Sequence, residues 1–316
     1  MINFFSKQFE MLNNIDITES INKNSFFSFE NAVNNEILDK ILNEIDLFNL
    51  KPNSLEISPV HANDGYYMSS GLAKSETLYK FLTSQKIINI SKQYLGKQFR
   101  LKCHRVYSVS PGAKNPWHTD NKKYGTKVLS NKGLVFLIYL NDVFDGEFQA
   151  IKGSHLISTD YQYSNFDEDV IEKYKDKIVS FKYPKGSIII FDNKAIHRAK
   201  PYFNYLWKRK SLFFQIDDNI NDGEKIIINT SFLKKIDEDI VNFLGLGRLS
   251  NMPHEPAGTK IETLNFMDIL KFQKKIFLAI IKRVIYRIKI LLSSDLKKKF
   301  QVIFKLKREV NSKEIK

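Results

Sequence analysis

The chain has almost no cysteine and no long uncharged hydrophobic run. Cys103 is the only cysteine, so no disulfide can form within the chain, and this composition fits a reducing cytosol. No run of about 18 apolar residues is free of charge, which predicts no membrane-spanning helix. The first residues lack the charged leader, apolar run and small-residue cleavage site of a signal peptide. We therefore expect a cytoplasmic protein.

The sequence also lacks the patterns of several large function classes. It has no glycine-rich nucleotide-binding motif, no internal repeat and no low-complexity block. No DNA- or RNA-binding motif accompanies its basic residues, and those near the C-terminus are interleaved with Ile, Leu and Phe. We therefore expect no nucleic acid partner.

Positive charge is concentrated at one end of the chain. The formal net charge is +14, and residues 265–316 hold 15 lysines and arginines against 4 acidic residues. Residues 1–264 are nearly balanced, with 34 basic against 31 acidic residues. Together with a Gly- and Pro-rich stretch at residues 244–263, this split predicts a body over residues 1–264 and a basic tail over residues 265–316.

Helical patterns come first in the chain and strand patterns follow. Apolar residues at helical spacing predict helices over residues 28–49 and 78–94, with a long loop over residues 51–71. From about residue 99 to residue 230, short apolar runs between turn residues predict a sandwich or a barrel. Strands are expected at residues 100–109, 133–140, 148–151, 178–183, 187–191, 211–216 and 226–229, with a polar, helix-compatible insertion at 161–177.

Three side chains form a candidate metal site. His118 and Asp120 are two residues apart, so in an extended segment they point to the same face. His197, just past the apolar run at residues 187–191, is the natural source of a second imidazole. Two imidazoles and one carboxylate leave three positions of an octahedron open, which suits iron(II) with a bidentate co-substrate and dioxygen.

Arg209 and Ser211 form a candidate co-substrate site. They share a face at the start of an expected strand, twelve residues after His197. A guanidinium pairs with a carboxylate through two bonds, and a serine hydroxyl adds another donor. This chemistry suits the distal carboxylate of 2-oxoglutarate, whose keto-acid end would chelate iron. Alternatively, Arg209 is a solvated charge at the end of a strand.

Taken together, these residues resemble the phytanoyl-CoA dioxygenase family of iron(II)/2-oxoglutarate oxygenases. Order and spacing agree from Arg100 to Asp217. Lys152, where the family usually has proline, and Glu147, in place of proline or a small residue, depart from the pattern and affect a turn. The matching features are His118-Thr119-Asp120, residues 133–140 leading into Asn141-Asp142-Val143, residues 146–155, Gly186-Ser187, His197, Arg209 and Ser211.

The resemblance implies a fold, a metal and a reaction. The expected fold is mostly β with helices, a double-stranded β-helix of jelly-roll or cupin-like type with N-terminal helices and a basic helical tail. The expected cofactors are Fe(II), 2-oxoglutarate and O2, with release of succinate and CO2. Because Asp120 is present as a ligand, no site is freed for halide, so hydroxylation or desaturation is favoured over halogenation. The substrate stays open among small-molecule, lipid-linked and glycan-type compounds.

Two other functions are compatible with a barrel. A cupin-like metal-dependent isomerase or epimerase would use more histidine ligands and lack the distal Arg-x-Ser pair. A non-catalytic barrel could act as a binding module with an interaction tail, although an intact set of three ligands argues against it. Metal analysis combined with a succinate-release assay distinguishes all three functions.

Several residues near the candidate site have undecided or structural roles. His155 is expected to be structural, because a fourth protein ligand would occupy a site that co-substrate or oxygen needs. Of His104 and Arg105, only one can face the barrel interior, and the sequence does not choose between them. Trp117 either lines the mouth of the barrel or is packed, and Arg198 is expected to point away from the metal face.

The tail has the pattern of a basic amphipathic helix. Such a helix lies in the interface of an anionic membrane, which would make the protein peripheral there. Packing on the barrel and a dimer seam are the alternatives, and the oligomeric state is undetermined. One face of the expected helix over residues 266–292 carries Phe266, Leu270, Phe277, Ile281, Val284, Ile288 and Leu291, and the opposite side carries Lys271, Lys274, Lys275, Lys282 and Lys289.

Overall fold

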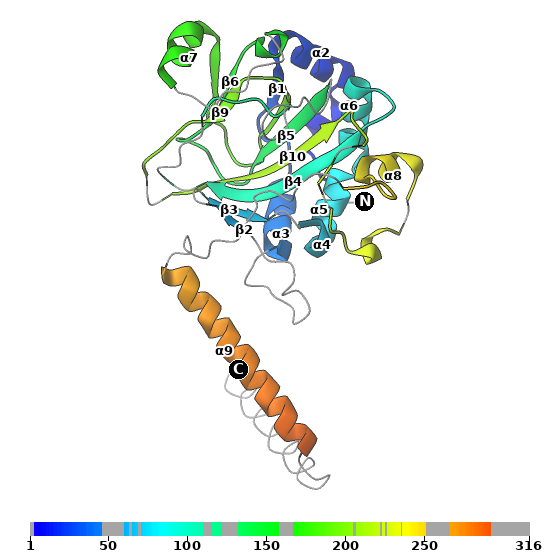
Figure 1. Cartoon of the computed structure of the whole chain (residues 1–316), viewed down its shortest axis with the longest axis vertical. Coiled ribbons are helices and arrows are strands. Elements are labelled where there is room, and N and C mark those ends of the chain that lie inside the picture. The colour runs from blue at the N-terminus through cyan, green and yellow to red at the C-terminus, as the bar shows by residue number, and fades with distance from the viewer. Residues whose placement is uncertain are drawn as a thin grey trace. The chain divides into compact units, whose positions relative to one another are not determined.

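The structure is a computed structural model of the whole chain. By its internal contacts the chain divides into two compact units, residues 1–263 and 264–316 (Figure 1). The second unit contains one long helix, α9 (Phe266–Leu291). The described residues are 3–45, 60–62, 65–68, 71–109, 111, 116–121, 132–157, 167–204, 207–221, 223–224, 226–234, 236–250 and 266–291.

A large antiparallel sheet is the centre of the first unit. Within the described residues its seven strands lie in the order β1-β8-β5-β10-β4-β3-β2, so the last strand in the chain, β10, lies between two earlier ones. The strands are β1 (Phe26–Phe29), β2 (Val60–Ala62), β3 (Gly65–Met68), β4 (Arg100–Val109), β5 (Gly133–Tyr139), β8 (Ile188–Asp192) and β10 (Arg209–Asp217).

A small antiparallel sheet accompanies the large one. It has the order β7-β6-β9, formed by β7 (Ile178–Phe181), β6 (Phe148–Ile151) and β9 (His197–Ala199). Tyr139 on β5 links the two sheets, because its hydroxyl donates to the carbonyl of Phe181 and accepts from the amide of Phe148, both at 2.9 Å. A shared apolar cluster also joins the sheets, with Val135, Phe148 and Phe191 among its members.

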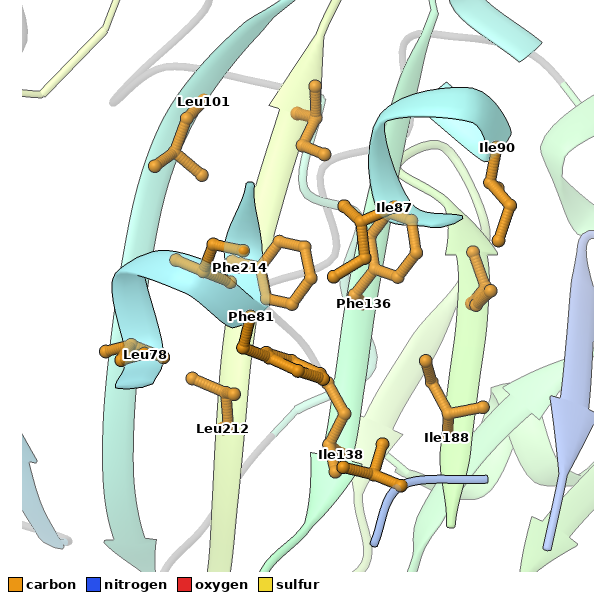
Figure 2. Packing of buried hydrophobic residues seen from close by; sticks show 14 of the residues in the cluster. Leu78, Phe81, Ile87, Ile90, Leu101, Phe136, Ile138, Ile188, Leu212 and Phe214 are labelled. Atoms are coloured by element: carbon orange, nitrogen blue, oxygen red, sulfur yellow. The ribbon is translucent and has the colours of Figure 1, made fainter. Parts of the chain in front are cut away.

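Helices cover the other face of the large sheet. In Figure 2, Leu78 and Phe81 of α5 and Ile87 of α6 lie against Phe136 and Phe214 of the sheet. The rings of Phe136 and Phe214 stack at 4.7 Å between centroids. The helices of this unit are α1 (Lys7–Met11), α2 (Asn14–Asn24), α3 (Asn35–Ile45), α4 (Gly71–Lys74), α5 (Glu76–Leu82), α6 (Gln85–Leu95), α7 (Asp167–Tyr174) and α8 (Glu238–Leu244).

Alternation along β10 separates the helical core from the candidate site. Leu212, Phe214 and Ile216 belong to the core cluster beneath the helices. Because successive side chains of a strand point to opposite faces, Arg209 and Ser211 lie on the other face, toward the small sheet. The same strand therefore contributes to stability on one side and to the site on the other.

Most of the expected strands are present. The predicted strands at residues 100–109 and 148–151 coincide with β4 and β6, and those near β5, β7, β8 and β10 differ by a few residues at their ends. The expected insertion contains α7 and a 3₁₀ turn at Lys175–Lys177. The described part of the first unit is a mixed α/β structure with antiparallel sheets rather than mostly β, because helices cover one whole face of the large sheet.

Four expectations about local structure are corrected. The helix expected over residues 28–49 is present only as α3, because Ser28 and Phe29 belong to strand β1, which pairs with β8. The helix over residues 78–94 is two helices, since Thr83 caps α5 and Ser84 begins α6. The expected loop at 51–71 contains β2, β3 and the start of α4. Residues 226–229 form no strand.

Candidate metal centre

The two candidate histidine ligands are joined through their main chains. The amide of His118 donates to the carbonyl of His197 and the amide of His197 donates to the carbonyl of His118, each at 2.9 Å. His197 begins β9, which pairs with β6 of the small sheet. This isolated bridge brings the segment after Pro116 onto the small sheet and sets the two imidazole rings 4.3 Å apart.

Asp120 completes a cluster of three potential ligands. Its Oδ1 lies 3.8 Å from Nε2 of His118, and its Oδ2 lies 3.4 Å from Nε2 of His197. One ligand atom from each residue can be chosen so that all lie within 4.8 Å of one another. The structure therefore brings together the three residues that the sequence predicted as ligands.

Hydrogen bonds fix which nitrogen of each histidine is free. Nδ1 of His118 lies 2.8 Å from the carbonyl of Pro116, and Nδ1 of His197 lies 3.0 Å from the carbonyl of Ala195. A carbonyl oxygen can only accept, so each Nδ1 carries a hydrogen, and the nitrogen able to present a lone pair to a metal is Nε2 in both rings. Both lone pairs are on the nitrogens that face Asp120. This is the usual way in which outer hydrogen bonds orient histidine ligands.

Burial keeps His197 in the form that binds metal. Its ring packs against Phe191 and Phe148, with centroids at 4.7 and 5.3 Å. Burial lowers the pKa of His197 to about 4, assisted by the nearby His118. The imidazole is therefore neutral near neutral pH, as ligation requires.

The carboxylate of Asp120 has an unsatisfied oxygen. Its Oδ2 is buried and has no hydrogen-bond partner. Burying an anionic oxygen without a hydrogen-bond donor is unfavourable in free energy unless a cation or another group interacts with that oxygen. Two free imidazole lone pairs beside that oxygen make a nitrogen and oxygen donor set that fits iron(II).

Arg209 and Ser211 also have unsatisfied buried atoms. Both side chains are buried, and neither Nε of Arg209 nor Oγ of Ser211 has a hydrogen-bond partner. Another nitrogen of Arg209 donates to the carbonyl of Gly146, and the Tyr202 hydroxyl accepts from the Arg209 amide at 3.3 Å. The guanidinium is therefore held in place while Nε stays free, which suits an incoming carboxylate. The alternative of a solvated strand-end charge is inconsistent with this burial.

The structure resolves the choice between His104 and Arg105. His104 faces the helices, where its Nε2 accepts from the amide of Leu72 at 3.4 Å. Arg105 is opposite Phe213 in the β4–β10 ladder, and its guanidinium lies 6.0 Å from the Phe213 ring. Arg105 also forms an ion pair with Glu224. Arg105 is therefore the residue that faces away from the helices. Sequence periodicity showed that only one of the two residues could face the barrel interior, but choosing between them required the strand register.

His155, Arg198 and Trp117, whose roles the sequence left open, lie in packed or hydrogen-bonded positions. Both ring nitrogens of His155 are used, one with Ser25 Oγ at 2.8 Å and the other with the carbonyl of Asn22 at 3.0 Å. Arg198 is buried, and its guanidinium carbon lies over the Trp117 ring, 4.5 Å from the ring centroid. Trp117 itself is fully buried and packed. His155 therefore has no nitrogen left for a metal.

Comparison with known proteins identifies the family. Fold and candidate site together have the features of a non-haem iron(II)/2-oxoglutarate oxygenase. Residues 24–204 match the family described as phytanoyl-CoA dioxygenase, and the chain belongs to this family. Iron(II) and 2-oxoglutarate are the metal and co-substrate typical of it, and His118, Asp120 and His197 lie inside the matched region. Arg209 and Ser211 lie just beyond it.

Solved structures show the same fold. The carbocyclase SnoK from nogalamycin biosynthesis, a non-haem α-ketoglutarate-dependent enzyme, is 14% identical with a TM-score of 0.52, covering 72% of this chain and 92% of its own. HygX from Streptomyces hygroscopicus, solved with nickel and 2-oxoglutarate, is 11% identical with a TM-score of 0.51, covering 64% of this chain and 86% of its own. No curated protein sequence matches significantly. The similarity places the body in the double-stranded β-helix fold of these enzymes.

Proposed function

We propose that His118, Asp120 and His197 hold Fe(II) and that Arg209 and Ser211 bind the distal carboxylate of 2-oxoglutarate. One observation carries the metal assignment: the Nδ1 atom of each histidine faces a carbonyl, so both Nε2 lone pairs are free beside the unsatisfied Oδ2 of Asp120. The free Nε of Arg209 and Oγ of Ser211 support the co-substrate assignment.

Each of these residues has a separate task. The two imidazoles and the carboxylate would fix the metal and leave adjoining positions for the co-substrate and dioxygen. Arg209 would orient 2-oxoglutarate through its far end. Phe148 and Phe191 pack on His197 and exclude water from that side of the site. Loaded with iron(II), a site of this type couples oxidative decarboxylation of 2-oxoglutarate to oxidation of a substrate.

The proposed reaction is hydroxylation of an unactivated C–H bond. Asp120 supplies a carboxylate in the position that a halogenating site must leave open for halide, so halogenation is disfavoured. Desaturation uses the same ligands and is an outcome to test. SnoK, a carbocyclase with this fold, illustrates that the fold also hosts ring closure. We propose a small-molecule, lipid-linked or glycan-type substrate.

One experiment separates this function from its alternatives. The purified protein is loaded with Fe(II) without oxygen, supplied with 2-oxoglutarate and oxygen, and assayed for succinate. We expect one bound iron and slow succinate release, both lost in Asp120→Ala. Tight metal binding with no succinate release under any conditions would favour a cupin-like isomerase or epimerase. Absence of bound metal would favour a non-catalytic binding module.

We further propose that the tail, residues 265–316, is a separate domain whose helix α9 binds an anionic membrane surface. Among the described residues, no helix is long and apolar enough to cross a membrane. Charge supports this choice of partner, since the tail holds 15 basic against 4 acidic residues. Such a helix lies in the interface and gains from anionic lipid. The exposed apolar side chains of α9 are Leu270, Ile276, Phe277, Leu278, Ile280, Ile281, Val284, Ile285 and Ile288.

A further inference from the structure

Four polar side chains are buried behind the segment that carries Asp120. Lys102 comes from β4, Gln215 and Asp217 come from β10, and Asn193 follows β8. Their exposed fractions are 5%, 3%, 2% and 0%. Charged and amide side chains are seldom buried this deeply unless they bond to one another or to the main chain. We call these four residues the buried polar group.

The buried polar group bonds to the main chain of Asp120 on both sides. Nε2 of Gln215 donates to the Asp120 carbonyl at 3.1 Å, and Nζ of Lys102 approaches the same oxygen at 3.5 Å. The Asp120 amide donates to the carbonyl of Asn193 at 2.7 Å. The backbone at Asp120 is therefore fixed from β4, β8 and β10, while its carboxylate points toward the two histidines.

The carboxylate of Asp217 holds the donors of this group together. Nζ of Lys102 lies 3.1 Å from its Oδ2. Its Oδ1 accepts from Gln215 at 3.0 Å and from Asn193 at 3.3 Å. A buried lysine and a buried aspartate each require an opposite charge, so removing either one leaves an uncompensated charge.

Gly133 provides the space for this arrangement. A Cβ atom at this position would lie 2.1 Å from Nδ2 of Asn193 and 2.3 Å from Oδ1 of Asp217. The amide of Asn193 also donates to the Gly133 carbonyl at 3.0 Å. The side chains of Asn193 and Asp217 thus fill the place that a side chain at Gly133 would take.

We propose that Lys102, Gln215 and Asp217 are positioning residues that set the Asp120 carboxylate at the right distance from His118 and His197. Gln215 and Lys102 bond to the carbonyl of Asp120, and Asp217 holds both of them, so the three residues act through the main chain of Asp120. The inference rests on the proposed metal site. Outer partners of this kind commonly change metal affinity by about 10–100-fold when they are replaced.

The test is metal affinity of the full-length protein, with Mn(II) as a redox-inert probe and free Mn(II) followed by electron paramagnetic resonance. Gln215→Met keeps the length of the side chain and removes the donor to Asp120. We expect Mn(II) binding at least about tenfold weaker than in the natural protein. The matched control is Thr77→Val, which removes a partly buried hydrogen bond of 2.8 Å to Glu44 between α5 and α3. We expect unchanged Mn(II) affinity in the control, whatever its melting temperature.

Two additional variants make the result decisive. If Gln215→Met does not fold, Asp217→Asn keeps the shape but removes the ion pair with Lys102, and the same weakening is expected. Natural Mn(II) affinity in a folded Gln215→Met or Asp217→Asn protein overturns the positioning role. Equal weakening in Thr77→Val also overturns it, because the effect would then follow general stability. His118→Ala tests the proposed metal site itself. Unchanged Mn(II) affinity in this variant would show that His118 is not a ligand, whatever the result for Gln215→Met and Asp217→Asn.

Discussion

The main chains of His118 and His197 bond to each other twice, each amide donating to the other residue's carbonyl at 2.9 Å. These residues are far apart in the sequence and come from a loop and from β9. The pair of bonds makes the placement of one ligand depend on the placement of the other. The candidate metal centre is therefore assembled from two segments of the chain, with Asp120 two residues after His118 in the first.

The first prediction concerns the ligands. Asp120→Ala removes the carboxylate but leaves the main-chain bonds of residue 120, so the fold should persist while bound iron falls to background. We expect the same loss of iron in His118→Ala and His197→Ala. Iron content by elemental analysis and the melting temperature without metal are the measurements. Full 2-oxoglutarate turnover in His197→Ala would show that this residue is not a ligand.

The second prediction concerns Arg209. Arg209→Lys keeps the charge but loses the planar guanidinium that can form two hydrogen bonds to a carboxylate. A lost charge-assisted hydrogen bond is worth ~1.5–3 kcal/mol, so the KM for 2-oxoglutarate should rise by about tenfold or more. Lys210→Ala is the matched control, because its exposed side chain points to the other face of β10. An unchanged KM in Arg209→Lys would count against the role.

The third prediction concerns the thiol of Cys103. Burial raises its pKa to about 11. Because a raised pKa lowers the fraction of reactive thiolate below that of an ordinary cysteine, the folded protein should react slowly with iodoacetamide at pH 8. Reaction should increase as pH rises toward 11 and become rapid at pH 8 after denaturation. Mass spectrometry measures the modified fraction, and fast labelling of the folded protein at pH 8 would contradict the prediction.

The fourth prediction concerns Gly133. Gly133→Ala places a methyl group where Asn193 and Asp217 already lie, so it should destabilise the protein by ~1–3 kcal/mol through overpacking. The melting temperature should fall by several degrees. Gly153→Ala is the control, because a Cβ there meets nothing within 4 Å and the cost comes only from its positive φ. An unchanged melting temperature in Gly133→Ala would contradict the overpacking.

The fifth prediction concerns α9. Full-length protein should sediment with anionic vesicles at low salt and much less with neutral ones. The charge reversals Lys274→Glu and Lys282→Glu are both at exposed positions. Each should make the free energy of binding to anionic vesicles less favourable by roughly 1 kcal/mol or more, so that less protein sediments. Failure to sediment with anionic vesicles at low salt would refute membrane binding.

Truncation tests the proposed division of the chain. Removing residues 265–316 should leave a folded, metal-binding body that no longer binds vesicles. Aggregation of the truncated protein, or a much lower melting temperature, would instead show that the helix packs on the body.

The three candidate metal ligands could be predicted from the sequence, and the structure brings them together, because their signals are local and ordered. His118 and Asp120 are close in the chain, and His197 follows a strand whose apolar run is easy to recognise. Arg209 and Ser211 were predicted as a co-substrate site from alternation within one strand. The buried state of Arg209 could not be predicted, because the basic run Lys208-Arg209-Lys210 is equally typical of an exposed strand end.

Elements that depend on distant partners were missed. The last two residues of β1, Ser28 and Phe29, were assigned to a helix, because this strand gains its extended form from pairing with β8, more than 150 residues later. The buried polar group was not found either. Lys102 and Asp217 look like ordinary surface charges in the sequence, and period-two alternation could not place Lys102, which lies at the register shift between β4 and β10 near Gln215.

The central place of β10 has a consequence for synthesis of the protein. Every other strand of both sheets leaves the ribosome before it, yet β10 lies between β4 and β5. A nascent chain shorter than about 217 residues therefore exposes two unpaired strand edges and lacks Arg209, Gln215 and Asp217. Unpaired edges attract other chains, so the growing chain passes through an interval in which it is open to aggregation and to holding by chaperones. Arrival of one strand ends that interval and completes the candidate site in the same step.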